Sequence, residues 1–159
     1  MNGVETLANP RSKAVDSVQL VAFTIGGRLF ATEIAEIKEI ISYRRPTPTP
    51  KRPPFVEGMI EHKGQILPVI SLRRRLGVTK GSAGAILLFR WGEKTVGLSV
   101  DAAHKVVSVE PISILSPPPR LFGIKSDYIK GVTNLGGRPL IWLDHLKLLT
   151  SEEEIVLVV

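Results

Sequence analysis

The sequence predicts a mostly β fold composed of two small, similar units that share an interface. Three observations support this fold class. Short apolar segments alternate with turns rich in glycine and proline, helical periodicity is confined to brief stretches, and an internal duplication relates the two halves of the 159-residue chain. Many short strands separated by such turns are typical of barrels and sandwiches. Each unit, at about 65 to 70 residues, would be only marginally stable alone, because small domains bury proportionately less surface.

The duplication appears in two pairs of segments. Residues 21–41, VAFTIGGRLFATEIAEIKEII, align without gaps with residues 87–107, LLFRWGEKTVGLSVDAAHKVV, at an offset of 66. Residues 58–70, GMIEHKGQILPVI, align with residues 131–143, GVTNLGGRPLIWL, at an offset of 73. Identities are few, so the comparison depends on the shared pattern of apolar residues and turn glycines. We therefore expect the same order of hairpins in both halves.

The first element expected in each half is a β-hairpin. Its strands are expected at residues 18–25 and 28–32 in one half, and at residues 85–91 and 95–100 in the other. Gly26 and Gly27 mark the first turn and Gly92 marks the second. Glycine readily adopts the positive φ angles that tight hairpin turns require, so these positions predict the two turns.

A second hairpin is expected later in each half. In the first half, residues 65–72 form an apolar β run that contains Pro68. Proline cannot donate to a ladder, and this predicts an edge strand or a bulged strand. In the second half, the strands are expected at residues 128–134 and 140–143, with Pro139 just before the last strand.

Helical signals are few and short. Ile34, Ile37 and Ile41 are spaced three and four residues apart with charged residues between them, which predicts a short amphipathic helix. Residues 72–76 form one or two turns at most. Asp144 is expected to cap a C-terminal helix, and a capping box is expected further on. The expected helix contains Leu146, Leu148 and Leu149, and the capping box consists of Ser151 and Glu154.

Composition and charge restrict the function. The chain has no cysteine, which excludes a disulfide scaffold, a thiolate zinc site and a cysteine nucleophile. With 21 basic and 15 acidic residues, the net charge is +6, concentrated in residues 43–55, YRRPTPTPKRPPF, and residues 73–75, RRR. Nucleic-acid binders usually interleave aromatic side chains with such clusters. Only Tyr43 and Phe55 flank the first cluster, so a solvated surface is the ordinary interpretation.

Signals for catalysis are weak. His62, His104 and His145 show no metal-ligand spacing, and the sequence lacks a GxSxG motif, a GxGxxG loop and a P-loop. Ordinary surface or structural histidines are therefore expected. No apolar run approaches the roughly 20 residues of a membrane-spanning helix. We expect a binding or scaffolding module without enzymatic activity, metal or cofactor, and without direct membrane insertion.

Four segments, met in order along the chain, carry a resemblance to a known family. They are LVAFTIGGRLFATEIAEIKEII, PPFVEGMIEHKGQILPVISLRRRLG, ILLFRWGEKTVGLSVDAAHKVVSV and YIKGVTNLGGRPLIWLDHLKLLTSEEE. Together they cover roughly residues 18–154 and resemble CheW, the coupling-protein family of bacterial chemosensory arrays. The resemblance implies two SH3-like five-stranded β barrels packed together, with short helices and a C-terminal helix.

The resemblance and the duplication together imply a domain layout. A flexible N-terminal tail is expected at residues 1–17, a CheW-like domain at residues 18–154 and a short apolar tail at residues 155–159. Within the domain, two duplicated β-barrel subdomains are expected at approximately 18–80 and 84–150. An exchange of strands between these subdomains is left open.

The resemblance also implies a function. Such proteins are non-catalytic adaptors that couple the cytoplasmic tips of chemoreceptors, the methyl-accepting chemotaxis proteins, to the regulatory domain of the CheA-type histidine kinase. The protein would be cytoplasmic, at membrane-associated receptor arrays, with no nucleic-acid partner. Two alternatives stay open. One is a CheW paralogue that binds array components without the kinase, and the other is a basic β-barrel that binds nucleic acid, as small barrels often do.

Candidate site residues follow from the resemblance. The receptor-binding residues are expected to be Ile37, Glu39, Ile40, Lys63 and Val106. The kinase-binding residues are expected to be Tyr43, Arg45, Thr47 and Phe55, on the proline-rich connector. In the family the glutamate faces a basic residue in an N-L-R-G turn, which reads E-H-K-G at residues 61–64 here. Lysine can supply the charge of the family arginine, but not its planar fork.

Further departures from the family pattern concern the partner more than the fold. Ser71 stands where the family usually has aspartate. Ala102 and Ala103 stand where the family more often has an acidic and a larger aliphatic residue. These departures put the choice of receptor in doubt. They suggest a divergent paralogue that serves a pathway such as surface motility or development rather than flagellar chemotaxis.

Overall fold

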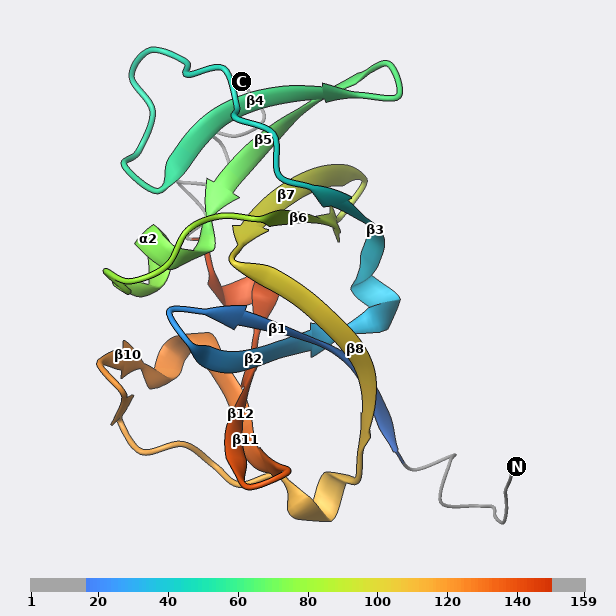
Figure 1. Ribbon diagram of the computed structural model, residues 1–159, viewed down its shortest axis with the longest axis vertical. Helices are drawn as coiled ribbons and strands as arrows, with labels where there is room; N and C mark the ends of the chain where they lie inside the picture. The colour runs from blue at the N-terminus through green and yellow to red at the C-terminus, as the bar shows by residue number, and fades with distance from the viewer. Residues whose placement is uncertain (1–16, 150–159) are drawn as a thin grey trace.

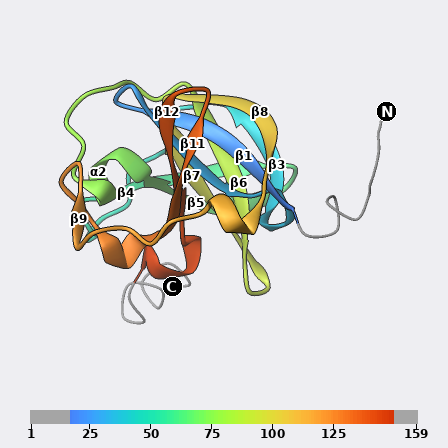
Figure 2. The same cartoon turned by 90° about the horizontal axis from the view of Figure 1, so that it is seen from below.

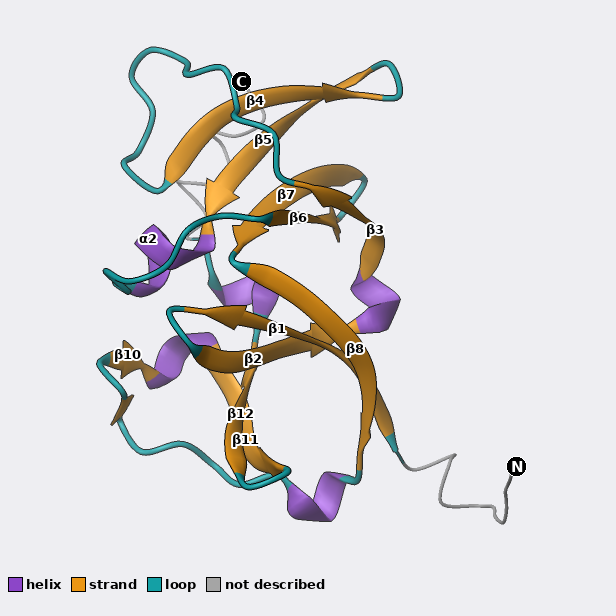
Figure 3. Ribbon diagram, viewed as in Figure 1, coloured by secondary structure: helices purple, strands orange, loops and turns teal. Residues whose placement is uncertain are grey.

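Two small β barrels make up the body of the molecule. The computed structural model describes residues 17–149, which form two five-stranded sheets and one two-stranded hairpin. Each five-stranded sheet curls into an SH3-like barrel, and the two barrels lie one above the other in Figure 1. Figure 3 shows that strands dominate and that the helices are short. The predicted fold class, mostly β with two barrels, is confirmed.

The sheets define the two barrels used below. The first barrel has the strand order β11-β12-β2-β1-β8, and the second barrel has the order β3-β6-β7-β5-β4. The strands of the first barrel are β1 (Val18–Ile25), β2 (Arg28–Glu33), β8 (Ala102–Val109), β11 (Ile129–Leu135) and β12 (Arg138–Leu143). Those of the second barrel are β3 (Ile37–Ser42), β4 (Val56–His62), β5 (Gln65–Ser71), β6 (Ala85–Trp91) and β7 (Lys94–Val100).

The remaining elements connect the strands. The small hairpin of β9 (Arg120–Leu121) and β10 (Ile124–Lys125) lies at the periphery, on the same side as α2 (Leu72–Leu76) in Figure 2. The single-turn 3-10 helices are η1 (Ile34–Glu36), η2 (Pro111–Ser113), η3 (Ser126–Tyr128) and η4 (His145–Lys147). Between residues 17 and 149, no helix has the length and apolar character needed to cross a membrane.

The barrels do not coincide with the two halves of the sequence. The β1–β2 hairpin comes from the first half, yet β2 pairs in parallel with β12 and β1 pairs with β8 from the second half. Conversely, the β6–β7 hairpin pairs with β3 and β5 from the first half. Each half therefore gives its first hairpin to the other half's barrel. The boundaries 18–80 and 84–150 follow the repeat in the sequence, whereas the sheets divide the chain differently.

Residue pairing shows how closely the two barrels correspond. In the β1–β2 hairpin Ile25 lies opposite Arg28, and in the β6–β7 hairpin Trp91 lies opposite Lys94, which is the offset of 66 seen in the sequence. In the second hairpins, the pair at Gly58 in β4–β5 corresponds to the pair at Gly131 in β11–β12 at the offset of 73. The expected order of hairpins is therefore confirmed.

A hydrophobic cluster that spans both barrels ties them together. Phe23 and Phe30 from the first barrel share this cluster with Leu87 and Phe89 from the second, and all four are fully buried. Two smaller clusters lie inside the individual barrels. Truncation of a buried phenylalanine typically costs about 3–5 kcal/mol. Because each barrel also needs a hairpin from the other half, we expect the two barrels to fold together.

The prediction that Pro68 marks an edge strand or a bulged strand is wrong, because β5 lies between β7 and β4 and the bulge in the β4–β5 pair lies on β4, between Val56 and Gly58. Pro68 faces Met59 of β4, whose N–H and C=O are both bonded to Thr47 on the opposite side. In this antiparallel pair the proline nitrogen therefore points toward β7, where pairing begins only at Val69. An interior strand thus tolerates a proline where the missing N–H would lie just beyond the end of the hydrogen-bonded ladder.

The predicted amphipathic helix over Ile34 to Ile41 is also wrong. A single 3-10 turn, η1, ends at Glu36, and the chain then continues as strand β3. Burial alternates along β3, and Ile37 and Ile41 pair with residues of β6. β-branched side chains fit such a pleated surface well. The neighbouring strand therefore prevails over the helical spacing of the isoleucines.

Where a C-terminal helix was predicted after Asp144, the described residues form a single 3-10 turn, η4, which ends at Lys147. The Asp144 carboxylate accepts a hydrogen bond from the backbone N–H of Leu146 at 3.2 Å, so the predicted cap is present at the start of η4. The capping box of Ser151 and Glu154, the predicted apolar tail at residues 155–159, and all but the last residue of the predicted tail at residues 1–17 lie outside the described residues.

Candidate functional site

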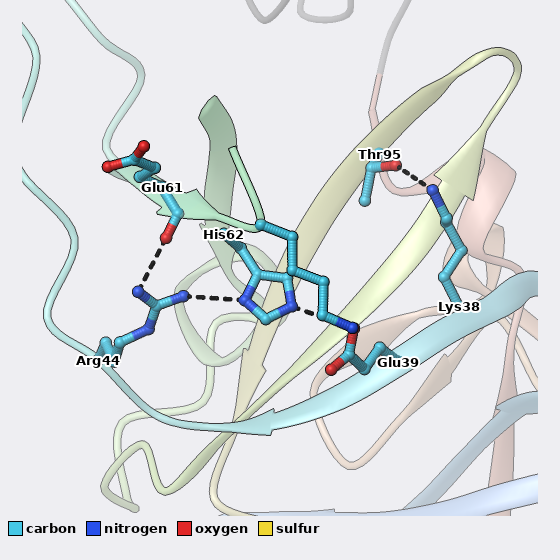
Figure 4. A network of polar contacts seen from close by, with 7 residues as sticks. Lys38, Glu39, Arg44, Glu61, His62 and Thr95 are labelled. Carbon is cyan, nitrogen blue, oxygen red and sulfur yellow. Dashed lines mark hydrogen bonds and ion pairs between the residues drawn. The ribbon is translucent and has the colours of Figure 1, made fainter. Parts of the chain in front are cut away.

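One carboxylate at the end of the second barrel is held by two basic side chains. Glu39 lies on β3, facing the turn that joins β4 to β5 (Figure 4). Its Oε1 atom lies 3.0 Å from His62 Nε2 and 3.2 Å from Lys63 Nζ. The expected pairing of Glu39 with Lys63 is therefore present. His62 is 19% exposed and Lys63 is 74% exposed, so the histidine is the less solvated of the two partners.

The turn conformation presents these basic residues to Glu39. Lys63 and Gly64 both have positive φ angles, 50° and 79°, in the two-residue turn between β4 and β5. Two positive φ angles are the signature of a type I′ hairpin turn. On the facing strand, a bulge between Ile37 and Glu39 breaks the regular register. Bulges re-aim side chains, and here the carboxylate faces the turn.

A contact with Arg44 fixes the tautomer of His62. Arg44 donates from Nη1 to the Glu61 carbonyl at 2.8 Å, and its Nη2 lies 3.3 Å from His62 Nδ1 (Figure 4). A guanidinium can only donate, so Nδ1 must be the acceptor. The proton of the neutral imidazole is then on Nε2, which donates to Glu39. Arg44 and His62 therefore belong to the site.

The network lowers the pKa of the Glu39 carboxyl below its ordinary value. The largest cause is the hydrogen bond from His62, followed by that from Lys63, while partial desolvation acts in the opposite direction. Hydrogen bonds to the charged form favour ionisation. The site thus presents a carboxylate that stays charged, beside apolar surface.

That apolar surface comes from β3. Ile40 is 42% exposed, whereas Ile37 packs against the central cluster and is only partly exposed. Ile40 is thus open to a partner, and Ile37 supports the strand beneath it. Val106 is 46% exposed and occupies the position on β8 that Ile40 occupies on β3. It belongs to the first barrel and lies outside the hydrogen-bonded network of Glu39.

The proline-rich connector between β3 and β4 is anchored to the barrel. The Tyr43 hydroxyl donates to Glu57 Oε1 at 2.5 Å, and Ser99 Oγ donates to the other oxygen of that carboxylate. Burial, and then the hydrogen bond to Glu57, raise the pKa of Tyr43 to about 12. Thr47 exchanges two backbone hydrogen bonds of 2.9 Å with Met59. Tyr43 and Thr47 therefore hold the connector against the barrel.

The four connector residues differ in their exposure. Arg45 and Thr47 are exposed, Tyr43 is half-buried, and Phe55 is 7% exposed. The guanidinium of Arg75 stacks over the Phe55 ring at 4.5 Å from its centroid. Phe55 therefore offers little surface to a partner and shapes the connector from below. The exposed face of this segment is polar and basic.

Sequence reasoning missed His62 and Arg44. His62 directly precedes the turn lysine, and a side chain at that position of a tight hairpin projects toward the same end of the barrel. Its two partners are 18 and 23 residues away in the sequence, so no local spacing indicated them. His145 behaves as expected of a structural histidine. It is buried beside Phe89 and Trp91, and burial lowers its pKa.

Among residues 17–149, no group of three or more histidine, aspartate and glutamate side chains is placed to hold a metal ion. The polar groups gathered at Glu39 instead satisfy one another, apart from the second carboxylate oxygen, which has no partner among the described residues. This oxygen points away from His62 in Figure 4. The arrangement suits recognition of a protein surface.

Fold and site together define a two-barrel binding module, and comparison with known proteins places it in a family. The CheW-like domain model matches residues 19–153. The protein therefore belongs to the CheW family.

Similar proteins agree with this placement. The chemotaxis protein CheW of Treponema pallidum is 30% identical, over 87% of this chain and 85% of the relative. The chemotaxis protein CheW of Klebsiella aerogenes is also 30% identical, over 96% of this chain and 93% of the relative. The crystal structure of the scaffolding protein TtCheW from Thermoanaerobacter tengcongensis is similar with a TM-score of 0.78 and 27% identity, over 86% of this chain and 90% of that one.

Proposed function

We propose that this protein is a non-catalytic adaptor that couples chemoreceptors to a CheA-type histidine kinase in a chemosensory array. The observation that carries the proposal is the CheW-like domain, which spans nearly the whole chain and presents an ordered carboxylate beside an exposed isoleucine. Its relatives are named chemotaxis and scaffolding proteins. In this role the protein works in the cytoplasm, at membrane-associated receptor arrays.

The receptor tip would bind at Glu39 and its surroundings. Ile40 and Val106 offer exposed apolar contacts, Ile37 supports β3 from below, and Lys63 adds a charge at the rim. Apolar contacts provide most of the affinity, while a fixed carboxylate selects the orientation of the partner. The second oxygen of Glu39 can accept a hydrogen bond from a donor on the receptor.

The kinase regulatory domain would bind the connector. Arg45 and Thr47 provide its exposed polar surface, and Tyr43 and Phe55 hold it in shape. The basic excess of residues 43–55 favours an acidic partner. Charges of this kind raise the association rate and the specificity more than the affinity.

Co-purification tests the proposal with the full-length chain. We expect it to retain both the cytoplasmic fragment of its cognate receptor and the regulatory domain of its cognate kinase. Ile40→Asp should weaken receptor binding at least tenfold and leave kinase binding unchanged. Ile66→Asp, at an exposed position on β5 outside the proposed site, is the matched control. Retention of neither partner would overturn the proposal, and retention of the receptor alone would favour a paralogue that works without the kinase.

A further inference from the structure

The internal duplication relates the Glu39 site to a pocket at the end of the first barrel. The pocket has a volume of about 400 Å³ and is lined by three apolar and three basic side chains. These residues, which define the basic pocket, are Ala22, Leu29, His104, Lys105, Leu135 and Arg138. At the offsets of the duplication, their counterparts in the second barrel are Leu88, Thr95, Lys38, Glu39, His62 and Gln65. Strand pairing in the two barrels follows the same offsets, so the two sets occupy equivalent places.

In the second barrel this end is closed. Lys38 Nζ donates to Thr95 Oγ1 at 3.1 Å, and His62 contacts Glu39 at 3.0 Å (Figure 4). Leu88 is buried and fills the space beneath. Polar bonds across the mouth and the large Leu88 side chain therefore occupy the places that line the open pocket in the first barrel.

In the first barrel the same end is open because two of its side chains differ from those of the second barrel. Ala22 stands in place of Leu88 and is smaller by several carbon atoms. Leu135 stands in place of His62 and has no polar atom to offer to Lys105 across the mouth. Neither of the two bonds that close the second barrel can form here. The result is a recess with an apolar floor.

The charge of the site is also reversed. Lys105 stands where the second barrel has Glu39, and no residue between 17 and 149 forms an ion pair with it. Arg138 donates to the Gly27 carbonyl at 2.9 Å, which fixes its guanidinium at the rim. His104 Nε2 lies 3.3 Å from Thr24 Oγ1. None of the lining residues that the structure describes is acidic, so the rim attracts an anion.

We propose that the basic pocket binds an acidic side chain flanked by an aliphatic side chain, presented by a partner protein. The rim supplies donors for a carboxylate, with Arg138 as the positioned one. The floor, formed by Ala22, Leu29 and Leu135, buries an aliphatic group and gives nothing to a compact hydrated anion such as phosphate. This inference goes beyond the adaptor function, because the pocket lies on the barrel that does not carry Glu39.

The test is an NMR titration of the full-length, ¹⁵N-labelled protein with the capped peptide Ac-Leu-Glu-Leu-NH₂. We expect chemical-shift changes at the residues of the basic pocket, and weaker binding as salt rises. The glutamine peptide Ac-Leu-Gln-Leu-NH₂ should bind at least fivefold more weakly. Equal binding of both peptides, or shifts confined to other surfaces, would overturn the proposal. Binding of N-acetyl-leucine but not of the glutamate peptide would also overturn it, since it would assign the pocket to a chain-terminal carboxylate.

Variants that copy the second barrel sharpen the test. Arg138→Gln introduces the residue found at the equivalent position 65, and it should weaken binding of the glutamate peptide at least threefold. The double change Lys105→Glu with Leu135→His recreates the closing pair of the second barrel and should abolish binding. Lys94→Gln, at an exposed lysine in the other barrel, is the matched control and should bind as the original chain does. If the double variant fails to fold, the Arg138→Gln result decides, because that position is exposed.

Discussion

At the end of the second barrel, Glu39 is held by His62 and Lys63. At the equivalent end of the first barrel, Lys105 occupies the position of Glu39 and Leu135 occupies that of His62, and a pocket is open there. The backbone around the two ends is nearly the same. Both hairpins turn at two residues with positive φ, and both edge strands carry a bulge at the same place. The two ends therefore differ in side chains and agree in architecture.

This comparison shows where a duplicated fold is free to change. Backbone pairing and the shared core fix the turns, bulges and glycines in both halves, because errors there cost several kcal/mol. Exposed side chains at the ends of the barrels contribute much less, since solvated ion pairs are worth only about 0–1 kcal/mol. They can therefore diverge into a charged, closed site on one barrel and a basic, open one on the other.

The largest expected effect is a loss of folding stability on substitution of Gly58, and we compare it with the same substitution at the equivalent Gly131. A Cβ atom at Gly58 would lie 2.1 Å from the backbone oxygen of Thr47, and φ is +144° there. A Cβ atom at Gly131 would lie 2.2 Å from a side-chain methyl of Ile114. A side chain can move aside more easily than a paired backbone, so the two substitutions should differ.

We expect Gly58→Ala to lower the free energy of unfolding by roughly 3 kcal/mol. Gly131→Ala should lower it by about 1–2 kcal/mol, as overpacking usually does. Urea unfolding of both variants measures the difference. Equal costs would show that the connector carrying Thr47 yields as readily as the Ile114 side chain.

Local elements of the fold could be predicted from the sequence, and the arrangement of the sheets could not. The first hairpins follow from apolar runs around glycine turns, because both signals act within a few residues. The parallel pairing of β2 with β12 joins Phe30 to Ile141, more than a hundred positions apart. No local pattern carries such a contact. The helix predicted from Ile34 to Ile41 failed for the same reason, since its outcome depends on pairing with β6.

The candidate site was predictable in part. The pairing of Glu39 with Lys63 was expected from the resemblance to the family, and the structure shows it. The roles of His62 and Arg44 were not, because Arg44 lies in a proline-rich segment that gives no indication of where its side chain points. The basic pocket was equally hidden. Its causes are the small Ala22 in place of Leu88 and two bonds that cannot form, and only the comparison of the two barrels reveals them.

An intermediate effect concerns two equivalent caps, Ser71 and Asp144. The Ser71 hydroxyl accepts a hydrogen bond from the Arg74 N–H at 3.2 Å, as the Asp144 carboxylate does from Leu146. The departure from the family aspartate at position 71 therefore keeps the cap. We expect Ser71→Ala to cost about 1 kcal/mol of stability and Ser71→Asp to cost little.

Thermal and urea unfolding of the two Ser71 variants check this prediction. Ser82→Ala, at an exposed position in the linker before β6, serves as the control and should be neutral. A Ser71→Asp variant as unstable as Ser71→Ala would show that the position demands the small hydroxyl for packing, since it is buried, and not for capping.

The smallest expected effect on stability comes from Glu39 and depends on pH. Its pKa is lowered in the folded state relative to the ordinary value of 4.5. The stabilisation is therefore fully present above that value and is lost as the pH falls through the folded pKa. Because the hydrogen bond from His62 is the largest cause, His62→Leu should raise the pKa of Glu39 toward 4.5 by more than Lys63→Gln does.

A ¹³C NMR titration of the Glu39 carboxyl in the original chain and both variants measures this difference directly. His62→Leu gives the second barrel a leucine at the position equivalent to Leu135 of the first barrel. The variant therefore also tests whether this one side chain accounts for the difference between the two ends. A larger pKa rise in Lys63→Gln would assign the carboxylate to the exposed lysine, as the family arginine suggests. If the hydrogen bond from His62 is the main contact that holds Glu39, His62→Leu should weaken receptor binding more than Lys63→Gln does. The reason is that a carboxylate released from the imidazole must be ordered again when the partner binds.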